Sequence, residues 1–356
     1  MGVQIAPVPQ RSPPERCQRA VSVQARYWRL NARPEGHDYA GALSLETRAL
    51  GAPKPGEVIV KAEYLSMDPG VRVWMTARED SYSPPIPLGA PMQGQFIGTV
   101  VESAADGFAA GDTVRGFGQW ADHSLVDATM SGLSKLDPDV RDVRDHFGAL
   151  GLNGWTALCG LRDVLNLQGG ETVLVSAAAG ATGSVACQIA RNMGCTVIGI
   201  AGSDAKCAYL TGTLGIARAI NYKREDVAAA LARIEGGINV YFENVGGALL
   251  DAALPNMAMY GRIGICGLIE GYTSDSGLPG PARFDQILMK RLTVSGIFLP
   301  DFMMKGIDYY PPLKQWYDAG KLRLDFDETR GLENVLVAFT RLMTGQNTGK
   351  VIVDIR

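Results

Sequence analysis

The residues best suited to chemistry are the glycines of a short turn near the middle of the chain. The stretch AAAGATGS has the spacing Ala177-x-x-Gly180-x-x-Gly183 and lies between a predicted strand and a predicted helix. There Gly180 lets the backbone approach a diphosphate, and Gly183 lets the helix pack closely on the strand, while the helix N-terminus offers N–H donors. The motif predicts that Ala178, Gly180, Thr182 and Gly183 bind a dinucleotide. A glycine-rich turn that binds nothing is the alternative.

The end of the second predicted strand indicates which dinucleotide to expect. Enzymes that use NAD usually carry Asp or Glu there, about 20 residues after the motif, to bind the ribose hydroxyls. Here that position is Gly202, followed by Ser203, which can donate a hydrogen bond, and Lys206, which can pair with a 2′-phosphate. Asp204 is the competing acid, and the N-cap of the next helix is its simpler role. Together with Tyr222, which opens the basic stretch YKR, these residues predict NADP(H).

The hydrophobic pattern of the elements that position these residues changes along the chain. Residues 25–150 contain short alternating runs separated by Gly, Asp and Pro, which predicts strands. From about 172 to 296, apolar runs without alternation are followed by amphipathic stretches, a pattern typical of a parallel sheet covered on both faces. The expected fold class is α/β, a β domain beside a doubly wound parallel sheet. Strands are expected at Glu57–Tyr64, Gln95–Glu102, Thr113–Phe117, Asp122–Val126 and Lys350–Ile355, and helices at Thr182–Met193, Asp204–Leu214, Glu225–Ile234, Ala248–Met257, Phe284–Lys290, Met303–Ala319 and Leu332–Thr344.

Composition narrows the function classes. A chain of 356 residues is long enough for two domains, and its net charge of −3 offers no basic excess for nucleic-acid binding. No apolar run reaches the roughly 18 residues that a membrane span needs. The six cysteines form no C-x-x-C pair, which favours reduced thiols in a cytoplasmic protein. Residues 1–24 lack the apolar core of a secretory signal and are expected to be a flexible extension.

The motifs taken together resemble a known family. The run GWTALCGL…GGETVLVSAAAGATGSVACQIA, with GSDAK, INY, FENVGG and ICGLI, is similar to the medium-chain dehydrogenase/reductase superfamily over about 26–356. The closest likeness is to its leukotriene/prostaglandin reductase branch, with plant alkenal double-bond reductases and bacterial curcumin reductase. The resemblance implies a GroES-like domain at 25–150 completed by 302–356, a Rossmann NADP-binding domain at 151–301, and a homodimer. It also implies NADPH-dependent reduction of the carbon–carbon double bond of α,β-unsaturated ketones and aldehydes.

The same superfamily includes zinc enzymes, so we compared the zinc-ligand positions. The zinc enzymes' G-H-E-x-x-G stretch corresponds to 93–98, QGQFIG, and the region of their first cysteine ligand holds only Met67 and Asp68. The lobe of four closely spaced cysteines that holds structural zinc is missing. The chain is therefore expected to bind no metal. The three histidines of the chain are scattered along the sequence and are expected to be surface or core residues rather than metal ligands: His37, His123 and His146.

Without a metal, hydrogen bonds must polarise the enone oxygen while hydride reaches the β-carbon, and a tyrosine or water must protonate the α-carbon. The resemblance assigns the main donor to Tyr272, in CGLIEGYTS, and a substrate-pocket contact to Tyr64. Both could instead be ordinary half-buried tyrosines. Thr156 is expected at a helix start near the nicotinamide, or as a simple cap. The other residues implied to contact the cofactor are Asn244, Val245, Gly246, Cys266, Phe298 and Asn347.

One departure concerns the substrate pocket. The family's typical DPYMR reads Asp68-Pro69-Gly70-Val71-Arg72 here, so a bulky aromatic has become glycine. We expect the Pro-rich loop 81–91 to rim the cleft. The side chains that could compensate for the missing aromatic are Trp74, Phe298 and Met304.

Two other functions remain open at this point. A zeta-crystallin-like NADPH quinone oxidoreductase shares the fold expected here and the absence of zinc, although GSDAK…NYK and CGLI-x-x-Y favour the alkenal branch. A non-catalytic protein that binds NADPH for stability or regulation belongs to a different class. An intact Tyr272 weighs against it.

Overall fold

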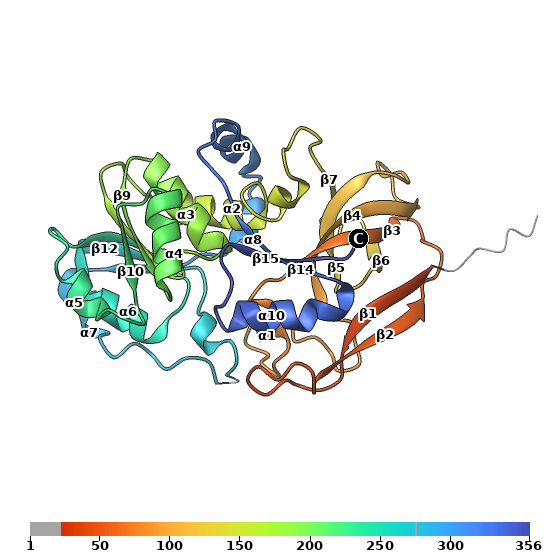
Figure 1. The fold of residues 1–356 in the computed structure, drawn as a ribbon, viewed down its shortest axis with the longest axis horizontal. Helices are drawn as coiled ribbons and strands as arrows, with labels where there is room; N and C mark the ends of the chain where they lie inside the picture. Colours follow the sequence, from red (N-terminus) through yellow and green to blue (C-terminus); the bar gives the residue numbers. More distant parts are fainter. Residues whose placement is uncertain (1–22, 275) are drawn as a thin grey trace, which may run out of the picture.

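The structure is a computed structural model that describes residues 23–274 and 276–356. Two sheet-containing lobes lie side by side, and the C-terminal strand runs between them (Figure 1). One lobe, the β lobe, holds a mostly antiparallel sheet, and the other, the α/β lobe, holds a parallel sheet with helices. This arrangement confirms the expected α/β class. The extension predicted at 1–24 lies, except for Val23 and Gln24, outside the described residues.

In the described chain, seven strands form the sheet of the β lobe, with the C-terminal strand β15 inside it. The order is β14-β15-β3-β4-β5-β7, and β6 pairs with β3. Because β15 pairs antiparallel with β3, the last residues of the chain complete a sheet that begins near its start. A separate antiparallel pair is formed by β1 and β2. The strands are β1 Gln24–Leu30, β2 Leu43–Ala49, β3 Glu57–Ser66, β4 Gln93–Ser103, β5 Thr113–Gln119, β6 His123–Asp127, β7 Ser134–Lys135, β14 Phe326–Arg330 and β15 Lys350–Asp354.

Large aromatic side chains fill the core of this lobe. Trp120 and Phe339 are fully buried, and their rings meet edge to face with centroids 5.1 Å apart. Phe339 lies on helix α10, Val335–Met343, which packs along β14 and β15. The short helix α1, Val71–Trp74, follows β3 and starts beside Gly70.

The α/β lobe is built on a parallel sheet with the order β10-β9-β8-β11-β12-β13. Chain order reverses between β8 and β11, so the connections of these two strands leave in opposite directions and open a crevice at their carboxyl ends. This is the edge where ligands bind in such sheets. The strands are β8 Thr172–Val175, β9 Thr196–Ala201, β10 Arg218–Asn221, β11 Ile238–Glu243, β12 Met257–Ile265 and β13 Thr293–Gly296.

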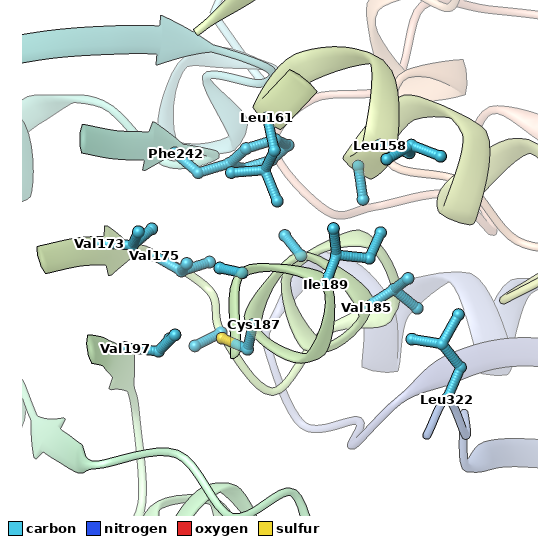
Figure 2. Packing of buried hydrophobic residues seen from close by; sticks show 14 of the residues in the cluster. Leu158, Leu161, Val173, Val175, Val185, Cys187, Ile189, Val197, Phe242 and Leu322 are labelled. Atoms are coloured by element: carbon cyan, nitrogen blue, oxygen red, sulfur yellow. The ribbon is translucent and has the colours of Figure 1, made fainter. Parts of the chain in front are cut away.

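Helix α3, Ala181–Asn192, follows β8 and is the central helix of this lobe. Figure 2 shows its Val185, Cys187 and Ile189 packed among side chains of β8, of the helix before it and of Phe242 on β11. Each of these residues is fully buried, which explains why the sequence pattern of α3 was easy to read. The other helices are α2 Leu152–Leu158, α4 Asp204–Ala208, α5 Val227–Leu231, α6 Gly247–Ala253, α7 Asp285–Lys290, α8 Leu299–Met303 and α9 Tyr310–Asp318, with π-helical continuations at Cys159–Val164 and Tyr209–Thr213.

Two predicted helices were wrong in extent. The helix expected at Met303–Ala319 begins only at Tyr310, as α9, and Met303 is instead the last residue of α8. Between the two helices Gly306 adopts a left-handed conformation with φ of 73°. The helix expected at Ala248–Met257 ends at Ala253, where Pro255 leads into a 3-10 turn, and Met257 already begins β12.

The C-terminal segment contributes to both lobes. Strands β14 and β15 and helix α10 belong to the β lobe, whereas α9 packs against α2. Tyr309, Leu313 and Tyr317 are buried in the same core as α3. Among the described residues, no helix is long and apolar enough to cross a lipid bilayer.

Candidate active site

The turn after β8 has the geometry that its glycines predict. Ala177 adopts φ of 45°, and a Cβ at Gly183 would lie 2.4 Å from the Ala177 carbonyl oxygen. A side chain at 183 would therefore push α3 away from β8. Gly180 is the N-cap of α3 and provides no capping side chain, so the first-turn N–H groups face the crevice without one. Thr182 is oriented by Asn153, whose Nδ2 donates to its Oγ1 at 2.9 Å.

The end of β9 leaves little room for a side chain at position 202. A Cβ on Gly202 would lie 2.9 Å from the ring of Tyr222, so the tyrosine occupies the space that a carboxylate would need. Lys206 stands beside this point, with its Nζ donating to the Gly345 carbonyl at 2.8 Å. Burial and the neighbouring Lys223 lower the pKa of Lys206, which shows that two cations share this corner. Such a corner suits an additional phosphate.

The prediction that Asp204 is the N-cap of the helix after β9 is wrong. The N-cap of α4 is Ser203, whose Oγ accepts from the Lys206 backbone N–H at 3.3 Å. Asp204 instead accepts from Asn221 Nδ2 at 2.6 Å and pairs with Arg224 at 2.5 Å. Its carboxylate is thus engaged by two side chains that follow or end β10.

The end of β11 carries a buried carboxyl group that organises the following loop. Glu243 Oε1 accepts from Ser176 Oγ at 2.7 Å and from the backbone N–H groups of Val245 and Gly246, at 2.5 and 3.0 Å. Asn244 is fixed as well, because its Nδ2 donates to the Ser176 carbonyl at 2.7 Å. Burial raises the pKa of Glu243, and its second oxygen, Oε2, makes no hydrogen bond within the described chain.

Tyr272 lies where the β12 connection meets the β lobe. Its hydroxyl oxygen accepts the Leu268 N–H at 3.2 Å, and no acceptor for its own proton is found among the described residues. Burial raises the pKa of Tyr272 to about 12, with a small contribution from Cys266. The hydroxyl is therefore protonated at neutral pH and can donate a hydrogen bond to a neighbouring oxygen.

Two predicted site residues do not join Tyr272. Tyr64 is 5% exposed and packs with Ile97, Phe147 and Ile352, while Arg356 covers its ring at 4.7 Å. Tyr64 therefore lies in this small cluster of the β lobe, and within the described part of the chain the structure shows no contact between it and Tyr272. Thr156 is the fifth residue of α2, which begins at Leu152, so it is neither a helix start nor a cap.

The C-terminal strand reaches the nucleotide turn. The Gly349 N–H donates to the Ala179 carbonyl at 2.8 Å, and Gly349 forms an isolated bridge with Gly180. Asn347 is buried beside them, and its Nδ2 donates to the Gly349 carbonyl at 3.0 Å. The approach of Asn347 to this turn agrees with its expected place near the cofactor.

Comparison with known families agrees with this geometry. Residues 26–135 match the N-terminal domain of oxidoreductase, and residues 181–316 match a zinc-binding dehydrogenase domain. A 2-alkenal reductase (NADP(+)-dependent) of Nicotiana tabacum is 38% identical over 83% of this chain and 87% of its own length. Prostaglandin reductase 1 of Mus musculus is 37% identical over 93% of this chain and 99% of its own. This chain belongs to the medium-chain dehydrogenase/reductase family.

A solved structure of this reductase family shows the same fold. CurA from Vibrio vulnificus in complex with NADPH superposes with a TM-score of 0.86 and 34% identity, covering 93% of this chain and 99% of that one. The resemblance inferred from the motifs is thereby confirmed, including its alkenal and prostaglandin reductase branch.

Asp68, in the region of the first zinc ligand of other family members, forms an ion pair with Lys350 of the C-terminal strand. Lys350 is 1% exposed, and its Nζ donates to Asp68 Oδ1 at 2.5 Å and to the Met67 carbonyl at 2.9 Å. Gln95 Nε2 also donates to Asp68, at 3.3 Å. Within 23–274 and 276–356, no cluster of three or more His, Cys, Asp or Glu side chains could hold a metal ion.

Four residues of this region were missed by sequence reasoning: Asn153, Glu243, Lys350 and Tyr82. Asn153 directly precedes the GWTAL run and Glu243 lies within FENVGG, but neither motif by itself assigns these two residues a role. Lys350 was read only as the first residue of a strand. Tyr82 lies in a loop whose conformation the sequence does not specify.

Proposed function

We propose that this protein reduces the carbon–carbon double bond of α,β-unsaturated ketones and aldehydes with NADPH. The observation that carries the proposal is the Tyr272 hydroxyl, which is protonated and has a free donor position at the carboxyl edge of the nucleotide-binding sheet. The Gly202, Tyr222 and Lys206 corner supports the phosphorylated dinucleotide. The relatives that carry alkenal and prostaglandin reductase names support the substrate class.

The site is suited to hold NADPH. Gly180 and Gly183 leave backbone space at the N-terminus of α3 for the diphosphate, and Lys206 and Ser203 lie where the 2′-phosphate would be. Hydrogen bonds to Glu243 fix the loop after β11, and we expect this loop to place Asn244 beside the nicotinamide ribose. Once bound, NADPH supplies a hydride to the β-carbon of the enone.

Tyr272 has two tasks in this proposal. Its hydroxyl donates a hydrogen bond to the enone oxygen, and this bond strengthens as that oxygen gains negative charge. The α-carbon then receives a proton from Tyr272 or from water, which balances the hydride added to the β-carbon.

The direct test is NADPH oxidation over enones, enals and quinones of graded size, together with the Tyr272→Phe variant. We expect enone reduction by the parent chain and a fall in kcat of about 100-fold in the variant, since one hydrogen-bond donor to a developing oxyanion contributes about that much. NADPH affinity, measured by the change in its fluorescence on binding, should stay the same. Parent-level enone turnover in Tyr272→Phe would remove the donor role.

The same screen decides between the alternatives. A clear preference for small quinones would replace the proposal with quinone reduction. NADPH binding without turnover of any acceptor would indicate a binding protein.

Assembly, location and domain division complete the proposal. A homodimer is supported by β13, an edge strand whose Val294 is exposed, and by the apolar Leu288 and Met289 on the adjacent α7.

A cytoplasmic location is supported by the five described cysteines, all of them unpaired. We keep the division at 25–150 with 302–356 and at 151–301, with α9 attached to the α/β lobe because it packs on α2.

A further inference from the structure

We propose that Tyr82 is a substrate-contacting residue that occupies the space left open by Gly70, and that this pair sets the size and shape of the enone accepted. The inference rests on the proposed function, because it assigns the wall of the same pocket. The sequence leads us to expect Gly70 beside the pocket and Tyr82 in the loop that rims the cleft, but it does not indicate that the two residues meet. The loop between α1 and β4 lies over the start of α1 and brings them together.

The glycine at position 70 is not required by the backbone. Gly70 adopts φ of −58° and ψ of −26°, a right-handed helical conformation that any residue adopts. A Cβ built there meets a single group within 4 Å, the Tyr82 hydroxyl at 3.0 Å. A larger side chain at position 70 would therefore compete with Tyr82 for the same space.

The ring of Tyr82 lies between two other aromatic side chains. Its centroid is 6.5 Å from that of Trp74, edge to face, and 5.3 Å from that of Phe298. Trp74 and Phe298 are two of the three residues expected to compensate for the missing aromatic. The third, Met304, is 80% exposed, so it does not fill this gap.

This aromatic group spans both lobes. Trp74 ends α1 in the β lobe, whereas Phe298 is the N-cap of α8 and follows the sheet of the α/β lobe. The Tyr82 ring therefore lies where the two lobes meet, beside Phe298, which is expected to contact the cofactor.

The loop that carries Tyr82 is held at its base. The Ile86 N–H donates to the Trp74 carbonyl at 2.8 Å, and Arg33 donates to the Ile86 carbonyl at 2.7 Å. Tyr82 itself is 62% exposed although two rings flank it. An open ring face with fixed neighbours is suited to stacking on a flat ligand.

The chemistry of the group predicts its preferred ligand. A planar enone conjugated to an aromatic ring can stack on the exposed rings of Tyr82 and Phe298. A short aliphatic enone offers too little surface to gain from the same contacts. The pair should therefore favour aryl-conjugated enones over small ones.

The test compares benzylideneacetone with methyl vinyl ketone in three variants: Tyr82→Ala, Gly70→Tyr and the swap Gly70→Tyr/Tyr82→Ala. In Tyr82→Ala, kcat/KM for benzylideneacetone should fall about ten-fold, mostly through KM, with little change for methyl vinyl ketone. Gly70→Tyr should lose activity on the aryl enone because two rings compete for one space. The swap should recover most of that loss, since it returns one ring to the gap.

Tyr260→Ala is the matched control, because Tyr260 is exposed to a similar degree, 67%, on β12. It should change neither substrate. NADPH binding and the thermal midpoint of each variant show whether it is folded, and the swap keeps the test decisive if Gly70→Tyr alone is unstable.

Failure of the inference can be told apart from failure of the proposed function. If the parent chain reduces neither enone, the proposed function fails. If it reduces both and Tyr82→Ala leaves their ratio unchanged, or the swap recovers nothing relative to Gly70→Tyr, the pairing of Tyr82 with Gly70 is wrong.

Discussion

Lys206 shows how one side chain can select a cofactor. Its Nζ already has the Gly345 carbonyl as one acceptor, and an ammonium has two further donors for a phosphate. Because Tyr222 lies in the space beside Gly202, a side chain at position 202 would require the exposed tyrosine ring to move. The corner therefore favours NADPH in two ways: Lys206 can bind the 2′-phosphate, and position 202 carries no acidic side chain to bind the ribose hydroxyls.

Lys206→Ala should raise the Kd for NADPH by about 10- to 100-fold, the usual effect of losing one hydrogen bond between charged groups. The Kd for NADH should change little. Fluorescence titration of both dinucleotides measures this, with Lys61→Ala as the control because Lys61 is an exposed lysine of β3. Equal losses for both dinucleotides would remove the assigned phosphate contact.

Tyr272 and Tyr64 show where reasoning from single residues stops. Both are tyrosines near strand ends that match family positions, and the sequence offered no reason to separate them beyond that match. In the structure, one hydroxyl has a free donor position, whereas the other ring is covered by Arg356. Strand alternation decides the direction of a side chain, but a register shift in the β3–β4 pairing between Ala62 and Tyr64 alters it locally.

At the scale of single elements, β13 is one of the two edge strands of the parallel sheet, and β10 is the other. Unpaired N–H and C=O groups at a sheet edge invite pairing with another chain. Val294 on β13 and Leu288 on α7 are both exposed there, at 44% and 73%. An edge and an apolar patch together favour association with a second copy of the chain.

The double variant Val294→Asp/Leu288→Asp should shift the chain from dimer to monomer, because burying two carboxylates at an interface is strongly unfavourable. Light scattering coupled to size-exclusion chromatography gives the mass of each. Val337→Asp, at an exposed valine of α10, should leave the dimer intact. A parent chain that is monomeric at every concentration contradicts the proposed dimer.

At the scale of the whole molecule, Lys350 connects the parts of the site. It follows Gly349, which is bonded to the nucleotide turn, and its ammonium binds Asp68 at the start of the turn that leads to Gly70. Burial opposes ionisation of Asp68. Attraction to Lys350 and hydrogen bonds from Lys350, Ser66 and Gln95 together outweigh burial, so the pKa of Asp68 lies below its ordinary value.

A pKa that is lower in the folded chain means that ionised Asp68 stabilises the fold above its unfolded pKa of about 3.9, and that this stabilisation is lost as pH falls through the folded pKa. Asp68→Asn should therefore lower the free energy of unfolding by about 3 kcal/mol at pH 7, since it leaves the Lys350 ammonium buried without its carboxylate. The difference from the parent should shrink steadily below about pH 4.

Urea unfolding at several pH values measures this difference. Asp106→Asn, at an exposed aspartate, serves as the control and should show no such pH dependence. A constant difference between parent and Asp68→Asn across acid and neutral pH would mean that the ion pair does not contribute in this way.

The sequence by itself determined the nucleotide-binding turn, the α/β class and the cofactor corner, because Gly180, Gly183 and the second-strand residues lie within one βα unit and act through local backbone geometry. It did not determine the breaks within helices, where one left-handed glycine ended α8. Only the tertiary structure brought Lys350 to Asp68, 282 residues away, and Tyr82 to Gly70 and Phe298. These pairings depend on how β15 enters the first sheet and how a loop folds back over α1, and neither leaves a periodic signal in the chain.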